Sequence, residues 1–316
     1  MTSERTRTGW TRALALLLLV GCSAEYHARK GRAALDEHQL TEAETQFRKA
    51  IDQDPRSPDA LAGLGWTYQI AGKREAARNA FSRCVEVVPE QVECLRGLAS
   101  VALSEGNPVQ ATELLTRARQ LRPEDPGVQS SLALLQLSQG DLEGAATAYS
   151  GLVERFPEMA EYRAGYAEAL LRQKKATEAI AVADAGLALA ETPIRFKAAL
   201  YSLKARALVA ATGGRVDPRD CAATAPPVFA WLEAADAALK QGEETGVGLP
   251  DLAGVGKMIA RRRAAVQERC PGVVAPSAGA ALPALAPPPP NAAVDGKPPP
   301  LKRPPKDEVA QEGTGP

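Results

Sequence analysis

The chain of 316 residues is poor in aromatic residues, in histidine and in net charge. Phenylalanine, tryptophan and tyrosine together make up 4% of it, and there are only two histidines. Lysine plus arginine number 38, as do aspartate plus glutamate, so the formal charge is zero. A neutral chain without a basic excess argues against nucleic-acid binding. No cysteine or histidine spacing matches a zinc site, and nothing else indicates a cofactor.

The chain has instead a repeat of 34 residues. Four prolines at this spacing each close a segment with the same apolar pattern: Pro55, Pro89, Pro123 and Pro157. The twentieth position of the five segments is always alanine: Ala43, Ala77, Ala111, Ala145 and Ala179. The eighth position is always glycine or alanine: Gly31, Gly65, Ala99, Ala133 and Ala167. Small residues at matched places let helices cross closely, and a period of this length predicts stacked helix pairs.

This pattern resembles the tetratricopeptide repeat family. The second segment matches best, at the residues Gly65, Tyr68, Ala77, Phe81 and Pro89. The resemblance implies an all-α fold, in which residues 22–193 form a helical solenoid of five repeats. Such an array offers a continuous surface for binding other proteins.

Residues 1–21 are predicted to be a targeting segment, because arginines precede an eight-residue apolar run that is too short to span a bilayer. The run ends in Leu-Val-Gly-Cys at 19–22, which resembles the lipobox of bacterial lipoproteins. That resemblance implies cleavage before Cys22 and acylation of its thiol. An ordinary secretory signal with a chance cysteine is the alternative. Ser23 after the cysteine implies sorting to the outer membrane, with the protein on its periplasmic face.

Four further cysteines are expected to meet an oxidising compartment after export, where pairing is favoured. The sequence allows three connectivities, of which we favour Cys221 with Cys270 and Cys84 with Cys94. Cys84 is near the end of one predicted helix and Cys94 near the start of the next, and the two ends meet around a turn. The alternative for Cys84 is a small core residue, since other repeats have alanine at that position.

After residue 193 the period fails, although helical patterning continues. We interpret 194–270 as a degenerate sixth repeat with a capping helix. Helices are expected at Phe196–Ala211, Val228–Lys240 and Leu252–Glu268. A loop is expected at Arg215–Pro227. Residues 271–316 are predicted to be a disordered tail, because 13 of these 46 residues are proline and none is aromatic.

The concave side of the solenoid is the candidate partner groove. In the resembled family, positions 2, 5, 9, 12 and 13 of each repeat face it. An apolar strip at the last three of these positions would suit an amphipathic helix of another protein, and arginines would orient an acidic one. The alternative is that position 12 is buried between neighbouring first helices. The candidate residues are Leu35, Trp66, Ile70, Leu103, Leu134, Leu137 and Leu171, with Arg32, Arg96 and Arg172.

Signals of catalysis are weak. Gly254-Val255-Gly256-Lys257 resembles a phosphate loop only superficially, since it lacks the upstream glycine, the following Ser or Thr and a preceding strand. We therefore predict a non-enzymatic adaptor, similar in layout to the pilotin lipoproteins of type IV pili, that binds other envelope proteins and helps an outer-membrane, pilus or secretion complex assemble. The alternative is a protein that recruits or regulates a cell-wall synthase or hydrolase.

Overall fold

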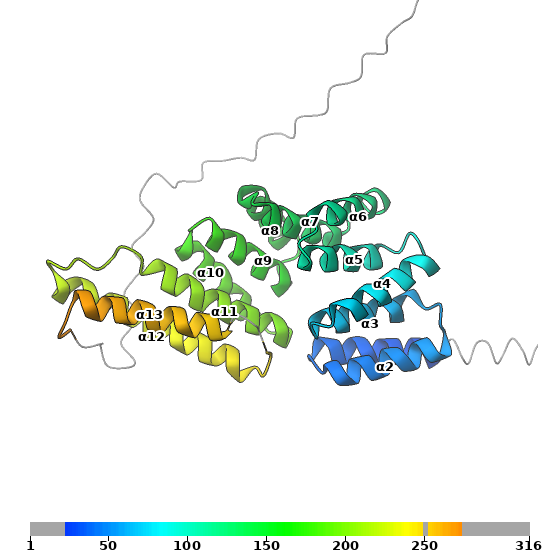
Figure 1. Ribbon diagram of the computed structural model, residues 1–316, viewed down its shortest axis with the longest axis horizontal. Helices are drawn as coiled ribbons and strands as arrows, with labels where there is room; N and C mark the ends of the chain where they lie inside the picture. The colour runs from blue at the N-terminus through cyan, green and yellow to red at the C-terminus, as the bar shows by residue number, and fades with distance from the viewer. Residues whose placement is uncertain (1–22, 249–251, 274–316) are drawn as a thin grey trace, which may run out of the picture. The chain divides into compact units, whose positions relative to one another are not determined.

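The computed structural model describes residues 23–248 and 252–273, which contain only helices, turns and loops. The first helix covers 23–36, and the others follow it in chain order (Figure 1). Their bounds are α2 Leu40–Gln53, α3 Pro58–Ile70, α4 Arg74–Val87, α5 Val92–Ser104, α6 Pro108–Leu121, α7 Pro126–Gln139, α8 Leu142–Arg155, α9 Ala160–Arg172, α10 Ala176–Leu187, α11 Ile194–Ala211, α12 Cys221–Glu244 and α13 Leu252–Arg269. The predictions for the targeting segment, Cys22 and residues 274–316 lie outside the described residues.

The helices are stacked as antiparallel pairs. Each packs against the next along the chain, and the first helices α3, α5, α7 and α9 also pack against one another. Helix α11 packs against both α9 and α12, so it takes the place of a first helix in a sixth pair, and α13 covers α11 and α12 (Figure 1). None of the described helices combines the length and hydropathy needed to cross a bilayer.

The small residues of the repeat lie where the helices cross. All five alanines at the twentieth position are at most 1% exposed. At the eighth position, a Cβ on Gly65 would lie 2.6 Å from a ring carbon of the fully buried Phe81, and one on Gly31 would lie 2.9 Å from Phe47. Each of these two rings therefore needs a glycine opposite it. This confirms the predicted reason for the pattern, since a bulkier residue would overpack the crossing.

The turn between the two helices of a repeat requires a left-handed residue. Gly72, Gly106 and Gly140 have φ of 72°, 73° and 83°, as glycine at a helix end allows. In the first and fifth repeats, His38 and Lys174 occupy the same position, with φ of 59° and 64°. The terminal repeats thus keep the backbone geometry without the residue that adopts it most easily.

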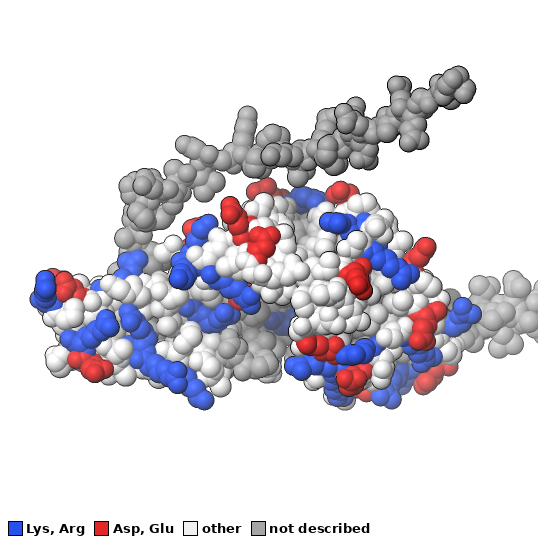
Figure 2. Space-filling view, turned by 45° about the horizontal axis from the view of Figure 1, so that its top comes forward, with Lys and Arg blue, Asp and Glu red and all other residues white. Residues whose placement is uncertain are grey.

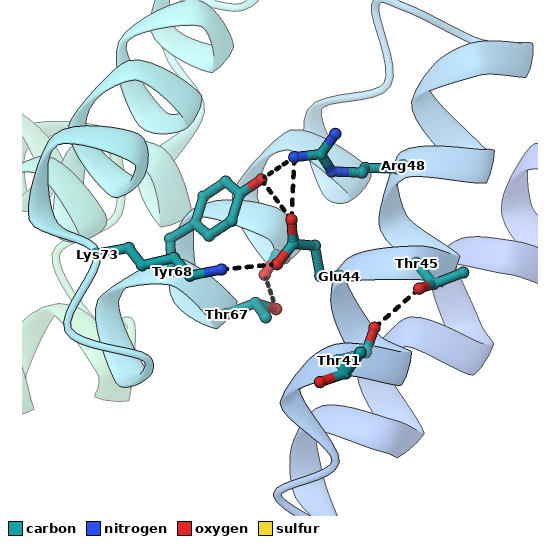
Figure 3. Close-up of polar contacts among 8 residues, drawn as sticks. Thr41, Glu44, Thr45, Arg48, Thr67, Tyr68 and Lys73 are labelled. Atoms are coloured by element: carbon teal, nitrogen blue, oxygen red, sulfur yellow. Dashed lines mark hydrogen bonds and ion pairs between the residues drawn. The ribbon is translucent and has the colours of Figure 1, made fainter.

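A polar network joins the first two repeats (Figure 3). The Glu44 carboxylate pairs with Lys73 at 3.1 Å and with Arg48 at 2.9 Å, and it accepts a hydrogen bond from the Tyr68 hydroxyl at 3.1 Å. Burial alone would raise the pKa of Glu44, but the bonds from Lys73 and Tyr68 bring it below its usual value. Tyr68, one of the residues that match the family pattern, therefore has a polar as well as a packing role.

Both favoured cysteine pairings are present. A disulfide joins Cys84 in α4 to Cys94 in α5, with the Cα atoms 6.1 Å apart, and another joins Cys221 to Cys270, with the Cα atoms 5.4 Å apart. The second ties the start of α12 to the end of α13. Both disulfides link neighbouring helices, so each strengthens a contact that packing already makes.

The predicted loop at 215–227 is wrong in its second half. Helix α12 begins at Cys221, and the side chain of Asp220 caps it by accepting a hydrogen bond from the main-chain N–H of Ala223. Pro226 and Pro227 lie inside the helix, where proline costs backbone hydrogen bonds. Packing outweighs this cost, because the residues that follow them are buried: Val228, Phe229, Ala230, Trp231 and Leu232. The disulfide also holds the first residue of the helix in place.

Candidate functional site

The first helices surround a cavity of about 680 Å³. Its wall comes from the end of the first helix, from α2, α3, α5 and α9, from the turn before α7, and from the start of α11. We call this cavity the groove. Its lining residues are Arg32, Leu35, Asp36, Phe47, Asp59, Ala62, Gly63, Trp66, Gln91, Val92, Glu93, Arg96, Arg122, Asp125, Glu161, Arg195 and Phe196.

The predicted leucine strip is not part of this wall, apart from Leu35. Leu35 and Leu137 are only 7% and 4% exposed. Ile70, Leu103 and Leu171 are half-buried and pack against the cores between helix pairs. Leu134 is exposed but does not line the groove. The burial of Leu35 and Leu137 contradicts an exposed strip at these two positions and agrees with the alternative, in which position 12 lies between neighbouring first helices.

Four of the predicted residues do line the groove: Arg32, Leu35, Trp66 and Arg96. The indole N–H of Trp66 donates to a Glu93 carboxylate oxygen at 2.6 Å, and Arg96 Nη1 donates to the other oxygen at 2.8 Å. Arg96 Nε also donates to the Ser131 hydroxyl at 3.2 Å. The guanidinium is thus held in one orientation, and its side chain is only 16% exposed. Arg172, by contrast, is engaged outside the groove by Glu168 and by the main-chain oxygen of Leu137.

The groove is lined by charges of both signs. Asp59 approaches Arg32 at 4.0 Å, Glu93 pairs with Arg96, and Asp36 pairs with Arg195 at 3.3 Å. Figure 2 shows the same mixture of signs on the viewed face of the N-terminal helices, while more positive than negative side chains appear over the C-terminal helices. A lining of this kind suits a polar, charged polypeptide segment better than an apolar one.

Glu161 is the least favourably placed of these charges. Burial raises the pKa of its carboxyl above 4.5, and the nearby positive charges of Arg96 and Arg195 offset this only in part. It lies in the first turn of α9 and lines the groove, where water is partly excluded. A basic group of a bound segment would lower this pKa.

Sequence reasoning missed the acidic residues at position 2 of the repeat. Asp59, Glu93 and Glu161 all occupy that position and all line the groove. The signal was available, because an acid stands there in four of the five repeats and the family pattern turns position 2 inward. No periodic signal points to Arg195 and Phe196, because they belong to α11, beyond the repeats.

No metal centre emerges from the described side chains. Within 23–248 and 252–273, no three histidine, cysteine, aspartate or glutamate residues converge in a way that could hold a metal ion. Gly254 and Lys257 lie inside helix α13, so that segment forms no phosphate loop. The groove offers hydrogen bonds, charges and shape, which are the means of binding.

Comparison with models of known protein families identifies the repeat to which these helix pairs correspond. Models of the tetratricopeptide repeat match residues 34–101 and 131–193. These helix pairs are tetratricopeptide repeats. Proteins built from such repeats are typically non-enzymatic scaffolds that mediate protein–protein interactions.

Three similar proteins illustrate the likeness. The Cellulose synthase 2 operon protein C of Komagataeibacter xylinus is 39% identical over 61 residues, which are 19% of this chain but only 5% of that protein. A tetratricopeptide repeat protein from Parabacteroides merdae has a TM-score of 0.56 at 16% identity, over 75% of this chain and 84% of its own, which shows the fold alone. The pilF structure from Pseudomonas aeruginosa, at 17% identity over 74% and 97% of the two chains, has a TM-score of 0.45 and carries no functional argument.

Proposed function

We propose that this tetratricopeptide repeat protein is an adaptor of the bacterial envelope. Its groove holds a segment of another envelope protein, and acyl chains on Cys22 hold it to the periplasmic face of the outer membrane. The single observation that carries the proposal is the groove itself, a polar cavity of about 680 Å³ inside an array of protein-binding repeats. The bound partner would be a component of an outer-membrane, pilus or secretion complex.

The cysteines support the location. Disulfides persist in oxidising compartments such as the bacterial periplasm and are rare in the cytosol. The described residues contain two of them, Cys84–Cys94 and Cys221–Cys270. The lipobox-like sequence ending at Cys22 agrees with the same compartment.

The chemistry of the groove narrows the kind of segment that it would hold. Trp66, Phe196 and Leu35 provide apolar contact, but they stand among carboxylates and guanidinium groups. A segment with one large apolar side chain between charged residues of both signs fits this lining. An amphipathic helix with a continuous apolar face does not, because the leucines expected to receive it are packed between helices.

Site-specific photo-crosslinking in native membranes tests the proposal. A photoreactive residue at Asp59, in the groove, is expected to capture a discrete envelope protein. One at Arg119, exposed on α6 and outside the groove, is expected to capture none. Trp66→Ala should abolish capture from position 59 while the circular dichroism spectrum stays unchanged. Equal capture from both positions, or capture that survives Trp66→Ala, contradicts groove binding.

Lipid anchoring is tested separately. Cys22→Ala should abolish incorporation of labelled palmitate and move the protein from the membrane fraction to the soluble periplasm, because acyl chains would be the anchor. A Cys22→Ala protein that stays in the membrane fraction contradicts the anchor and leaves the groove proposal intact.

The alternative function is recruitment of a cell-wall synthase or hydrolase. The observation that favours it is the relative whose name places it in a cellulose synthase operon, although the match covers a short stretch of that protein. Identification of the protein captured from position 59 distinguishes the two, since a cell-wall enzyme supports recruitment and a pilus or outer-membrane component supports assembly.

A further inference from the structure

An ion pair connects the two ends of the helix stack across the groove. Arg195 Nη1, at the start of α11, lies 3.3 Å from Asp36 Oδ1, in the last residue of the helix at 23–36. The two residues are 159 positions apart in the chain. Both line the groove, as do the residues beside them, Leu35 and Phe196. The pair therefore lies on the border of the cavity rather than at a remote surface.

Little else of polar character holds these two ends together. Within the described part of the chain, no disulfide and no main-chain hydrogen bond joins the first helix pair to α11. The Asp36 side chain is 55% exposed and that of Arg195 is 27% exposed. An ion pair so accessible to water contributes little free energy and weakens with salt. The pair can therefore stabilise contact between the two ends and still open readily.

The turn after the first helix provides a second observation that Arg195 lies close to the first repeat. His38 takes a left-handed conformation there, and its Nδ1 atom is buried without a hydrogen-bond partner. Burial lowers the pKa of His38, and the positive charge of Arg195 lowers it further. Arg195 therefore acts on this turn at two points, Asp36 and His38.

The architecture lets a small link have a large effect. In a solenoid each repeat contacts mainly its neighbours, so small rotations between pairs add up along the stack. Asp36 lies in the first helix pair and Arg195 at the start of the sixth, so the rotations of about five successive steps add up to set the distance between them. A contact between the ends selects the most curved arrangement.

We infer that Asp36 and Arg195 form a clasp that closes the groove at one side, and that groove access rises when the clasp opens. The inference concerns entry to the groove and does not depend on which segment binds there. It assigns Arg195 and Phe196, which lie beyond the five repeats, to the gate of the binding site.

Charge exchange tests the clasp. The full chain carries a fluorophore pair on non-canonical residues at Lys49 in α2 and Glu191 just before α11, both exposed, so the native cysteines stay untouched. Asp36→Arg and Arg195→Asp should each raise the open-to-closed ratio about fivefold, which corresponds to about 1 kcal/mol. The double exchange should restore the distance of the unaltered protein. Glu244→Lys, which breaks an exposed ion pair within α12, is the matched control and should change nothing.

Salt and quenching provide independent measurements. At 1 M salt, where screening acts within about 3 Å, the unaltered protein should shift to the long distance. The single variants, in which the repulsion between like charges is screened as well, should not open beyond that distance. Acrylamide quenching of Trp66, isolated by subtracting the signal of Trp66→Phe, should rise in both single variants and return in the double exchange. Single variants with unchanged distance and quenching, or a double exchange that behaves as the sum of the two, would overturn the clasp.

Discussion

The five repeats and the C-terminal helices are both stacks of paired helices, yet different contacts hold them. In the repeats, the same crossing recurs, with a glycine or alanine against a large ring, as at Gly65 and Phe81. In α11–α13 the links occur once each: a disulfide, an Arg262 side chain that donates to the Thr212 hydroxyl at 2.9 Å and to its main-chain oxygen, and a pair between Arg263 and Asp236. The periodic sequence thus repeats one local contact along the array, alongside a single disulfide, Cys84–Cys94, whereas the contacts named in α11–α13 each occur once.

Removing the disulfide of the C-terminal helices should have the largest effect on stability, and that effect should be confined to these helices. Cys221→Ser with Cys270→Ser opens a loop of 49 residues, for which the chain-entropy estimate is about 4 kcal/mol. Amide hydrogen exchange should accelerate in α12 and α13, while protection in α3–α8 stays the same. An equal loss of protection along the whole array would show that the two regions unfold as one unit.

Two helical glycines, one at a tight crossing and one with open space around it, separate the effect of packing from the effect of helix propensity. Gly65→Ala should lose about 1–3 kcal/mol, because the new methyl group overlaps the Phe81 ring. Gly151→Ala, in α8, has nothing within 4 Å of the new carbon and should gain about 0.5–1 kcal/mol from helix propensity. Urea unfolding followed by circular dichroism measures both, and a stabilising Gly65→Ala would refute the crossing argument.

The groove supplies a prediction that depends on pH. Since burial raises the pKa of Glu161 above 4.5 in the folded protein, its ionisation costs stability at neutral pH. Glu161→Gln should therefore be more stable than the unaltered protein at pH 7. The difference should shrink as the pH falls through the raised pKa and below 4.5, where the carboxyl becomes protonated in both states. Glu158→Gln, at an exposed position before α9, is the control and should show no such trend in thermal unfolding.

The turn of the first repeat, at His38, should have the smallest effect on stability. The pKa of His38 is lowered below 6.5, so its contribution to stability is present above that pH and is lost as the pH falls through the folded pKa. His38→Asn, which tolerates the left-handed backbone, should lose less stability between pH 7.5 and 5 than the unaltered protein does. Lys174→Asn, at the equivalent turn of the fifth repeat, should leave the pH profile of the melting temperature unchanged.

Prediction from the sequence succeeded for the repeated residues and for both disulfides, and it failed for the start of α12 and for most of the groove lining. The alanines and glycines at the crossings, the turn glycines and the helices at 194–211 and 252–269 were all expected from their patterns. The start of α12 was missed because proline at 226 and 227 is a strong local signal against a helix, and only the burial of Phe229 and Trp231 outweighs it. Of the predicted groove residues, Arg32, Leu35, Trp66 and Arg96 line the cavity, and the other leucines do not.

By itself, the sequence determined that the chain stacks helix pairs every 34 residues, because close crossings need small residues at fixed places and these can be read without coordinates. It did not determine which side chains face the groove. Whether a leucine at position 12 points inward depends on how far each pair rotates on the next, and whether Asp36 meets Arg195 depends on the sum of those rotations over the array. Only the tertiary structure decided these features, since curvature accumulates from many small packing angles that no local pattern records.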